Sequence, residues 1–229
     1  MKSKHIIIVG AGPGISMSVA KKFGKEGYVI SLISRSADKL IQYSAELNKL
    51  GIRNSVFEAD SSNYKMLEHQ INLAVIKQGA PKMVLYNAFK ASGGTALSYS
   101  TDDFHKDFDI NVMGALRVTK IALPNMINNG GGKLLFTGGG LAHYPHEDYA
   151  SLSIGKAALL TLVKLLSQEV QSEKIQIGTL TIMGFVAVGT FYDPDKIAEV
   201  YWNLFNTNSD SWNTETLYHE NKSNLLQDK

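Results

Sequence analysis

The sequence predicts a doubly wound α/β fold, in which helices cover both faces of one parallel sheet. Short apolar runs alternate with amphipathic stretches along most of the chain, which is the pattern of repeated β-α-β units. The apolar runs are nearly continuous, as is typical of strands buried on both faces. A chain of 229 residues with no Pro, Gly or Ser-rich linker suits a single domain over residues 1–229 with a sizeable core.

The elements follow in order along the chain. Strands are expected at residues 5–9, 28–33, 54–58, 82–86, 133–137 and 175–182. Apolar residues recurring at intervals of three and four predict helices that begin near Ile15, Ser36, Asn63, Thr101, Leu152 and Asp195. Residues 206–229 turn polar and lose this periodicity, so they are expected to form a C-terminal tail or an arm against a partner subunit.

The composition excludes several classes of function. The chain has 23 Lys and Arg against 21 Asp and Glu, and the basic residues are scattered, so nucleic acid is not an expected partner. The absence of cysteine excludes disulfides, cysteine nucleophiles and thiolate metal sites. The first apolar run is too short for a signal peptide core or a membrane span. The sequence therefore predicts a soluble, cytoplasmic protein without a membrane partner.

A glycine-rich turn follows the first predicted strand and opens the first predicted helix. Its residues are Gly10, Gly12, Pro13, Gly14 and Ile15. Glycines allow the backbone to turn tightly and to approach a pyrophosphate, whose charge meets the free N–H groups of a helix N-terminus. Between a strand and a helix this pattern predicts a dinucleotide site, the alternative being a purely structural turn.

The end of the second predicted strand bears on the choice of cofactor. An acidic residue there would bind the ribose 2′-hydroxyl of NAD(H), but the chain has Ser34-Arg35-Ser36 instead. A guanidinium flanked by hydroxyls suits a 2′-phosphate, so NADP(H) is favoured and NAD(H) remains possible. The alternative for Arg35 is an exposed, solvated side chain.

Further short motifs follow the later strands and helices. They are Asp60-Ser61, Asn87-Ala88, Asn111, Lys156 in Gly155-Lys156-Ala157, and Gly184-Phe185-Val186. With the glycine turn, these motifs resemble the short-chain dehydrogenase/reductase superfamily over roughly residues 5–205. The resemblance implies a Rossmann-type three-layer fold, a nicotinamide cofactor, a small-molecule substrate and a homodimer or homotetramer.

The resemblance also implies roles for these residues. Asp60, Ser61, Asn87, Ala88, Gly184 and Val186 would bind the cofactor, with Asp60 at the adenine amine. Asn111 would be the family's helix-kinking catalytic asparagine. Lys156 would be the catalytic lysine, which also holds the nicotinamide ribose.

Two positions depart from the family pattern. In the family, a serine and a tyrosine polarise the substrate carbonyl and deliver a proton, and the lysine lowers the pKa of the tyrosine. Counting back from Lys156 places Leu152 at the tyrosine position and Gly139 at the serine position. Neither side chain transfers a proton, so the sequence predicts a complete nucleotide site beside a degenerate catalytic site.

Other residues nearby are candidates for the missing proton donor. Tyr149 precedes Lys156 by nearly two helical turns, about 10 Å by helix rise, which disfavours direct coupling unless the loop curls. His143 and His146 lie in the same loop and have the chemistry of a general acid, but the favoured interpretation of each is an ordinary exposed residue of a polar loop. Two histidines without a third ligand make a weak zinc site, so no metal is predicted. Thr137 is interpreted as a β-branched strand residue.

Two features bear on partners and substrate. The helix near Leu152 has an apolar face, formed by Ala157, Ala158, Leu159, Leu162, Val163 and Leu166, that suits either the core or a subunit interface. Residues 184–195 leave room for only a short lid, which favours an open pocket for a bulky substrate or a macromolecular partner. Two functions stay open: an NADP(H)-dependent oxidoreductase acting on a carbonyl, alcohol or activated double bond, and a catalytically impaired dinucleotide-binding protein acting through a partner.

Overall fold

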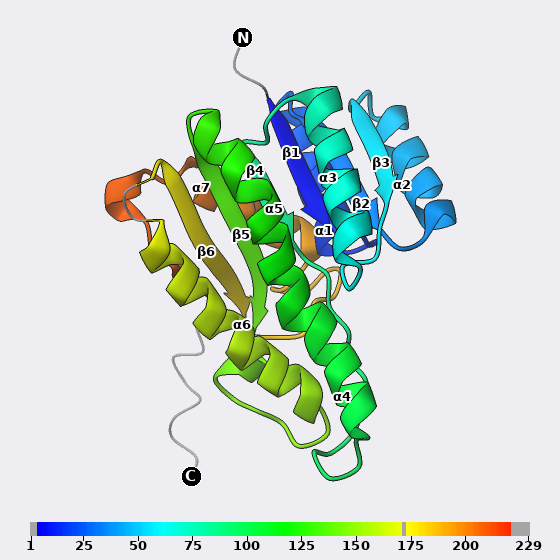
Figure 1. Ribbon diagram of the computed structural model, residues 1–229, viewed down its shortest axis with the longest axis vertical. Coiled ribbons are helices and arrows are strands. Elements are labelled where there is room, and N and C mark those ends of the chain that lie inside the picture. The colour runs from blue at the N-terminus through cyan, green and yellow to red at the C-terminus, as the bar shows by residue number, and fades with distance from the viewer. Residues whose placement is uncertain (1–3, 171–172, 221–229) are drawn as a thin grey trace.

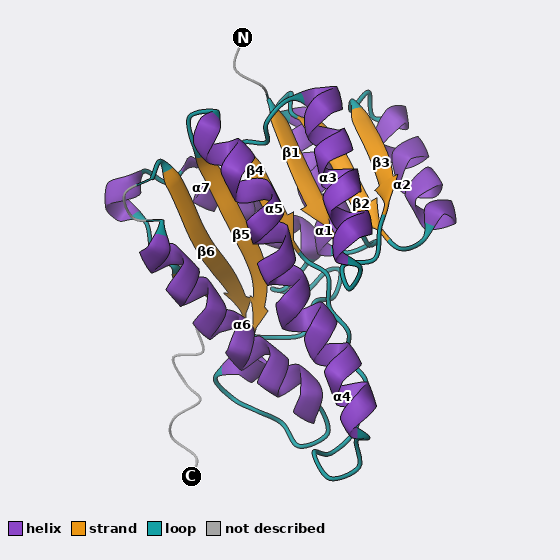
Figure 2. Cartoon of the chain, viewed as in Figure 1, coloured by secondary structure: helices purple, strands orange, loops and turns teal. Residues whose placement is uncertain are grey.

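The computed structural model describes residues 4–170 and 173–220, which form one seven-stranded sheet with helices on both faces (Figures 1 and 2). All strand pairs are parallel, and the order across the sheet is β3-β2-β1-β4-β5-β6-β7. The strands are β1 (His5–Val9), β2 (Val29–Ser34), β3 (Asn54–Glu58), β4 (Met83–Tyr86), β5 (Gly132–Gly139), β6 (Ile175–Ile182) and β7 (Glu215–Tyr218). The helices are α1 (Ile15–Lys25), α2 (Ala37–Lys49), α3 (Tyr64–Gln78), α4 (Thr101–Phe108), α5 (Gly114–Asn128), α6 (Ala150–Glu169) and α7 (Pro194–Asn206). The predicted doubly wound fold is confirmed.

The apolar runs reach both faces of the sheet because successive side chains of a strand point to opposite sides. In β1, Ile7 and Val9 pack in the core beneath α3, α5 and α6, whereas Ile6 and Ile8 pack in the core beneath α1, α2 and α7. Each of these side chains is almost fully buried. Burial on both faces explains why the run shows no polar alternation.

The C-terminal part of the sheet differs from the sequence prediction. Residues 206–229 were expected to form a tail or an arm, but β7 lies within this range and pairs with β6. Trp212 lies just before β7, and its indole Nε1 donates a hydrogen bond to the Ile177 carbonyl at 3.1 Å. A four-residue strand flanked by polar residues gives too weak a periodic signal to be found from sequence. Residues 221–229 lie outside the described part of the chain.

The long helix pair α4 and α5 is joined by one turn of π-helix, Asp109–Met113. The hydroxyl of Tyr86, at the end of β4, donates a hydrogen bond to the Ile110 carbonyl inside this turn. Gly114 permits the approach, because a Cβ there would lie 2.1 Å from the Tyr86 oxygen. The irregular turn therefore has a defined cause, and it contains Asn111.

Helix α6 is long and apolar enough, with a mean hydropathy of 1.4 over its most apolar window, to meet the length and composition criteria for a membrane span. Long core helices meet the same criteria. Leu159, Val163 and Leu166 bury one face of α6 against the sheet, which settles that part of the predicted apolar face as core. Ile154 and Leu165 are 46% and 52% exposed on other faces.

Candidate active site

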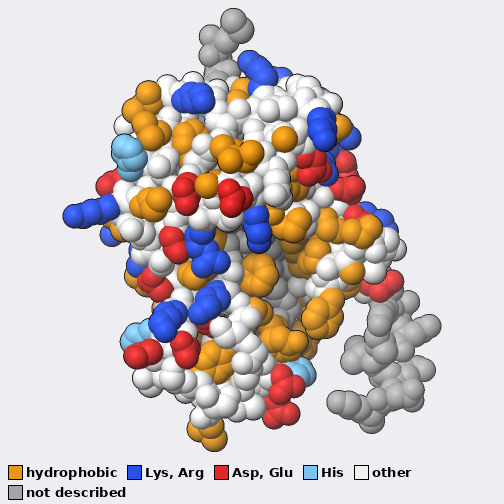
Figure 3. Space-filling view, turned by 90° about the vertical axis from the view of Figure 1, so that its right-hand side faces the viewer, with side chains coloured by type: hydrophobic (Ala, Val, Ile, Leu, Met, Phe, Trp, Pro, Cys, Tyr) orange, Lys and Arg blue, Asp and Glu red, His pale blue; other side chains and the backbone are white. Residues whose placement is uncertain are grey.

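A cavity of about 930 Å³ opens at the carboxyl ends of the parallel strands. In the space-filling view it forms a hollow bordered largely by hydrophobic side chains (Figure 3). Its walls combine the turn after β1, the end of β2, the segment after β4, the end of β5, α6 and the segment after β6. In an open α/β sheet, ligands bind at this edge where the strand order reverses, here between β1 and β4.

The glycine turn forms one end of the cavity. Gly10 has a φ of +87°, and a Cβ there would lie 2.2 Å from the backbone nitrogen of Ala88, so no larger residue fits. Gly14 is the N-cap of α1, and no side chain caps this helix end. Ser16 lies in the first turn of α1, and its hydroxyl turns inward, donating to the Gly10 carbonyl and accepting from the Asn87 amide. The backbone N–H groups at this helix end thus remain accessible to an anion.

Two cations stand at the adjoining end of β2. Arg35 lines the cavity beside Ser34 and Ser36, as the sequence predicts, and Lys39 joins it from the first turn of α2. The Ser36 hydroxyl caps α2 by accepting from the Lys39 N–H, which fixes the start of the helix. Both cations are exposed to solvent at the rim. This rim has the charge and the donors to bind a phosphate.

Ser61, Asn87 and Ala88 also line the cavity, whereas Asp60 does not. The Asp60 carboxylate accepts hydrogen bonds from the N–H and the hydroxyl of Ser62, at 2.9 and 2.8 Å. Asp60 is thus engaged in its own turn, and the structure does not bring it to the cavity with the other residues predicted to bind the cofactor.

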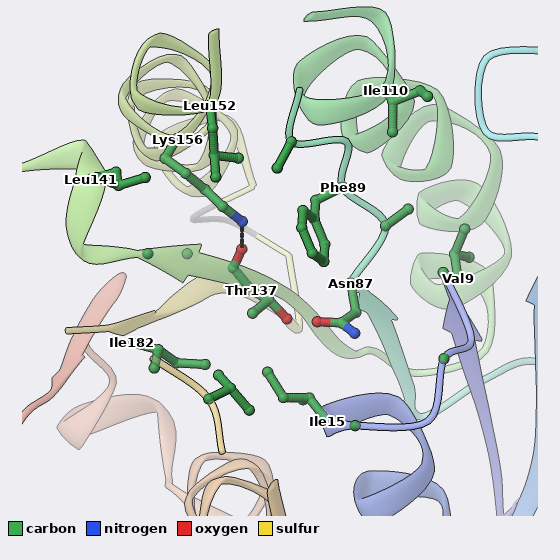
Figure 4. A pocket seen from close by; sticks show the side chains of 18 of the residues that line it. Val9, Ile15, Asn87, Phe89, Ile110, Thr137, Leu141, Leu152, Lys156 and Ile182 are labelled. Atoms are coloured by element: carbon green, nitrogen blue, oxygen red, sulfur yellow. Dashed lines mark hydrogen bonds between the residues drawn. The ribbon is translucent and has the colours of Figure 1, made fainter. Parts of the chain in front are cut away.

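Lys156 extends from α6 into the cavity (Figure 4). Its Nζ donates a 2.7 Å hydrogen bond to the Thr137 carbonyl in β5, and the Phe89 ring centroid lies 5.8 Å away. Burial lowers the pKa of Lys156 to about 8. Among the described residues that line the cavity there is no Asp or Glu, so no carboxylate offsets this burial.

Leu152 and Gly139 lie beside Lys156. Leu152 lines the cavity one turn before Lys156 on α6 (Figure 4). Gly139 ends β5, and a Cβ there would lie 3.5 Å from Lys156 Cε, an ordinary van der Waals distance. At Gly138, by contrast, a Cβ would press on the Thr179 and Thr181 hydroxyls at 2.7 and 2.8 Å. Position 139 is therefore the one that faces the lysine with room for a side chain.

Asn111 lies behind the cavity wall. Asn111 is almost fully buried, with 3% of the residue exposed. Its side-chain amide makes two hydrogen bonds to the backbone of Lys90, at 2.8 and 2.9 Å. Gly155 of α6 packs against it, since a Cβ there would lie 3.0 Å from the Asn111 Cβ. Asn111 thus positions both the segment after β4 and the helix that carries Lys156.

The remaining proton-donor candidates separate into two groups. Tyr149 and His146 line the cavity, and their rings lie 5.7 Å apart. His143 does not line it, because its Nε2 lies 2.7 Å from the Glu215 carboxylate of β7. Thr137 is a β5 residue whose hydroxyl pairs with Tyr201, in agreement with its interpretation as a strand residue. No group of His, Cys, Asp and Glu suited to a metal ion occurs in the described residues.

Comparison with known families decides the assignment. A family model described as short chain dehydrogenase matches residues 4–191. The chain belongs to this family. The matched range runs from β1 to the segment before α7, so it includes the cavity walls described above.

Curated members of the short chain dehydrogenase family are similar at low identity. Oxidoreductase UcpA of Salmonella typhimurium is 28% identical over 183 residues, which is 79% of this chain and 68% of that protein. A 3-dehydrosphinganine reductase of Danio rerio is 24% identical over 77% of this chain and 55% of that protein.

Solved short chain dehydrogenase structures share the fold. An alcohol dehydrogenase from Thermococcus sibiricus, complexed with 5-hydroxy-NADP, has a TM-score of 0.83 at 22% identity and covers 94% of this chain and 97% of its own. An actinorhodin polyketide ketoreductase with NADPH has a TM-score of 0.87 at 18% identity over 95% and 97%. At such identities the likeness shows the fold alone.

Several cavity residues of this short chain dehydrogenase escaped the sequence argument. They are Lys39, Phe89, Ile110, Leu141, Tyr144 and Met183, among others. Lys39 lies one helical turn after the Ser36 cap, a spacing that could have paired it with Arg35. The apolar residues carry no such signal, since a leucine or phenylalanine in a loop looks the same whether it lines a cavity or not.

Proposed function

We propose that the protein is an NADP(H)-dependent oxidoreductase of short-chain dehydrogenase type, acting on a carbonyl, an alcohol or an activated double bond. One observation carries this proposal. A single cavity joins the uncapped N-terminus of α1, the cations Arg35 and Lys39, and Lys156, and no described Asp or Glu lines it. Such a cavity suits a long, polyanionic ligand with a phosphate at each of two subsites.

The residues of the chain fit the dinucleotide in a definite order. The α1 N-terminus would hold the pyrophosphate, Arg35 with Ser34 the 2′-phosphate, and Lys156 the nicotinamide ribose. Two similar folds have been solved with NADPH or an NADP derivative, which supports this choice of ligand. Once bound, the nicotinamide supplies or accepts a hydride.

Calorimetric titration with NADP⁺ and NAD⁺ tests the cofactor assignment. We expect Arg35→Ala to weaken NADP⁺ binding by about 1.5–3 kcal/mol, the range for a charge-assisted contact, and to leave NAD⁺ binding nearly unchanged. Arg53→Ala is the matched control, because Arg53 lies outside the cavity and should change neither affinity. Equal losses for both dinucleotides in Arg35→Ala would contradict the proposal.

The catalytic part of the proposal is that Leu152 and Gly139 take the places of the family's tyrosine and serine. Their positions beside Lys156 support this. The same observation favours a second candidate function, a dinucleotide-binding protein that has lost redox catalysis and acts through a partner. Incubation with NADPH and a panel of carbonyl and enone substrates separates the two candidates, because only the enzyme consumes NADPH under these conditions.

We further propose a soluble cytoplasmic protein that forms a homodimer or homotetramer through α6. Ile154 and Leu165 support the interface, because they leave apolar surface on the outer part of this helix. Analytical ultracentrifugation of wild type and Leu165→Glu tests it, and the variant should sediment as a smaller species.

A further inference from the structure

The reaction end of the cavity has an unusual composition for a site that reduces carbonyl groups. The labelled side chains nearest Lys156 in Figure 4 are Leu152, Phe89 and Leu141, all of which line the cavity. The nearest hydroxyl-bearing strand residue, Thr137, already pairs with Tyr201 at 2.7 Å. Lys156 is thus a cation in apolar surroundings, without an Asp or Glu partner among the described residues that line the cavity.

Such a cation interacts favourably with an anionic ligand. Its Nζ donates a hydrogen bond to a backbone carbonyl, that of Thr137, and no described carboxylate lines the cavity. An oxyanion placed beside it would interact through a medium of low dielectric constant, where fixed charges act far more strongly than in water. The lowered pKa of Lys156 shows that its charge is poorly compensated, and a bound anion would supply the missing compensation.

We propose that Lys156 stabilises a delocalised oxyanion, and that the site therefore takes conjugated hydride acceptors, α,β-unsaturated ketones or quinones, in preference to isolated ketones. This inference rests on the proposed dinucleotide-dependent function and narrows its substrate class. It assigns to Lys156 an electrostatic role toward the substrate in addition to any contact with the ribose.

The chemistry balances without a protein acid in the hydride step. The β-carbon of an enone gains a hydride from the reduced dinucleotide, which is thereby oxidised, and a new C–H bond forms. The π electrons of the C=C bond move to the bond between the α-carbon and the carbonyl carbon, and those of the C=O bond move onto oxygen. The enolate that results is held by the Lys156 ammonium until water protonates its α-carbon.

The hydride step differs for an isolated ketone in the same site. Hydride addition at its carbonyl carbon produces a localised alkoxide, which is far more basic than an enolate and needs a proton as it forms. Leu152 and Gly139 offer none. The Lys156 ammonium could give a proton only by losing the positive charge that stabilises the oxyanion. Tyr149 and His146 lie at the exposed rim of the cavity, with their rings 5.7 Å apart.

Binding of a delocalised anion without any dinucleotide tests the role of Lys156 directly. The probe is 4-nitrophenolate, whose absorbance reports both binding and ionisation, and 4-nitroanisole is its neutral analogue. We expect the wild type to bind the phenolate at least tenfold more tightly than the anisole. Lys156→Met should abolish this preference, Lys156→Arg should keep it, and Lys120→Met, which removes an exposed lysine of α5, should leave it intact.

A variant at the cavity rim tests whether 4-nitrophenolate binds at the phosphate subsite instead. Arg35→Ala should bind 4-nitrophenolate as the wild type does, because Arg35 lies at the other end of the cavity. The circular dichroism spectrum of each variant checks its fold. An unchanged phenolate preference in folded Lys156→Met, or a loss of it in Arg35→Ala, would overturn the inference.

A matched pair of substrates tests the expected preference for conjugated acceptors over isolated ketones. 4-Phenyl-3-buten-2-one and 4-phenyl-2-butanone differ only in the conjugated double bond. With NADPH we expect the enone to be consumed at least about a hundredfold faster, to yield the saturated ketone, and to show a solvent isotope effect near one. Comparable rates, an alcohol product, or NADPH binding without consumption of either compound would contradict the inference. Failure to bind NADPH in calorimetry would instead overturn the proposed function.

Discussion

The two ends of the cavity differ in the kind of residues that determine their chemistry. At the dinucleotide end, backbone N–H groups and two cations surround a space that glycines keep open, so the residue types alone indicate the ligand. At the reaction end, apolar side chains surround one lysine, and the chemistry depends on what is missing beside it. Substitutions at the phosphate-binding rim should therefore leave the reaction end nearly unaffected, whereas substitution of Lys156, which we propose to contact both the nicotinamide ribose and the substrate oxyanion, should affect binding and catalysis together.

The largest expected effect comes from making the reaction end polar. Gly139→Ser with Leu152→Tyr should raise the reduction of isolated ketones by about 10²- to 10⁴-fold, the usual contribution of a positioned acid. The space beside Gly139 accepts the new side chain, since its Cβ would meet only the flexible stem of Lys156. NADPH consumption with 4-phenyl-2-butanone measures the gain.

Gly139→Ser with Leu152→Phe is the matched control, because it adds the ring without its hydroxyl. It should show no gain. A gain of the same size in both double variants would mean that ring packing, and not proton transfer, limits the wild type.

The next effect concerns Asp107, which joins the segment after β4 to α6. Its fully buried carboxylate accepts hydrogen bonds from Ser92 and Ser151 and pairs with Lys90 at 2.8 Å, so it fixes the segment after β4 against α6. Asp107→Asn should lower the free energy of unfolding by about 2–3 kcal/mol, since it leaves a partly buried network incomplete. Asp103→Asn, at an exposed ion pair with Lys106, should cost less than about 1 kcal/mol. Urea denaturation checks both.

The same carboxylate predicts acid sensitivity. Burial raises the pKa of Asp107, but the hydrogen bonds from Lys90, Ser151 and Ser92 outweigh it, and the pKa lies below its ordinary value of 3.8. A depressed carboxyl pKa contributes stability above the unfolded value and loses it as the pH falls through the folded value. Wild type should therefore lose stability below about pH 4 more steeply than Asp107→Asn in parallel urea titrations. Identical pH profiles would contradict this role.

The sequence predicted the fold well because its signals are local. Apolar runs placed β1, β3 and β6 with their observed bounds, and Ser36 and Asn63 marked two helix starts as side-chain caps. β7 was missed because four polar-flanked residues have no periodicity of their own and depend on β6 for pairing. β7 therefore depends on tertiary contacts rather than on a local sequence signal.

At the site, the structure brings residues of motifs with a fixed spacing to the cavity, whereas residues whose orientation depends on other contacts turn away from it. The glycine turn, Arg35 and Lys156 lie where they were expected. Asp60 and His143 are close along the chain to cavity residues, yet Asp60 accepts hydrogen bonds from Ser62 in its own turn, and His143 pairs with Glu215, which only the folded structure brings near. Spacing specifies which element carries a residue, whereas neighbours on other elements specify where its side chain points.

A moderate loss of NADP⁺ affinity is expected when Lys156 is replaced or when the pH is raised. Lys156→Met should weaken NADP⁺ binding roughly tenfold, about 1.4 kcal/mol, by removing a charge-assisted contact. Because burial lowers the lysine pKa to about 8, the free protein loses this charge as the pH rises through that value. Affinity of the wild type should fall above about pH 8 in calorimetric titrations, and that of Lys156→Met should stay level. A parallel decline in both would assign the pH dependence to another group.

The smallest effect should come from Lys39 at the dinucleotide end. Lys39 lines the cavity beside Arg35 but is exposed, and its flexible ammonium acts as a point charge rather than a bidentate donor. Lys39→Ala should weaken NADP⁺ binding by about 0.5–1 kcal/mol, spare NAD⁺, and lose its effect in high salt, because solvent-exposed charges are screened. Lys49→Ala, at the far end of α2, is the control and should change nothing. An effect of Lys39→Ala as large as that of Arg35→Ala, or one that persists in high salt, would place the 2′-phosphate against Lys39 instead of Arg35.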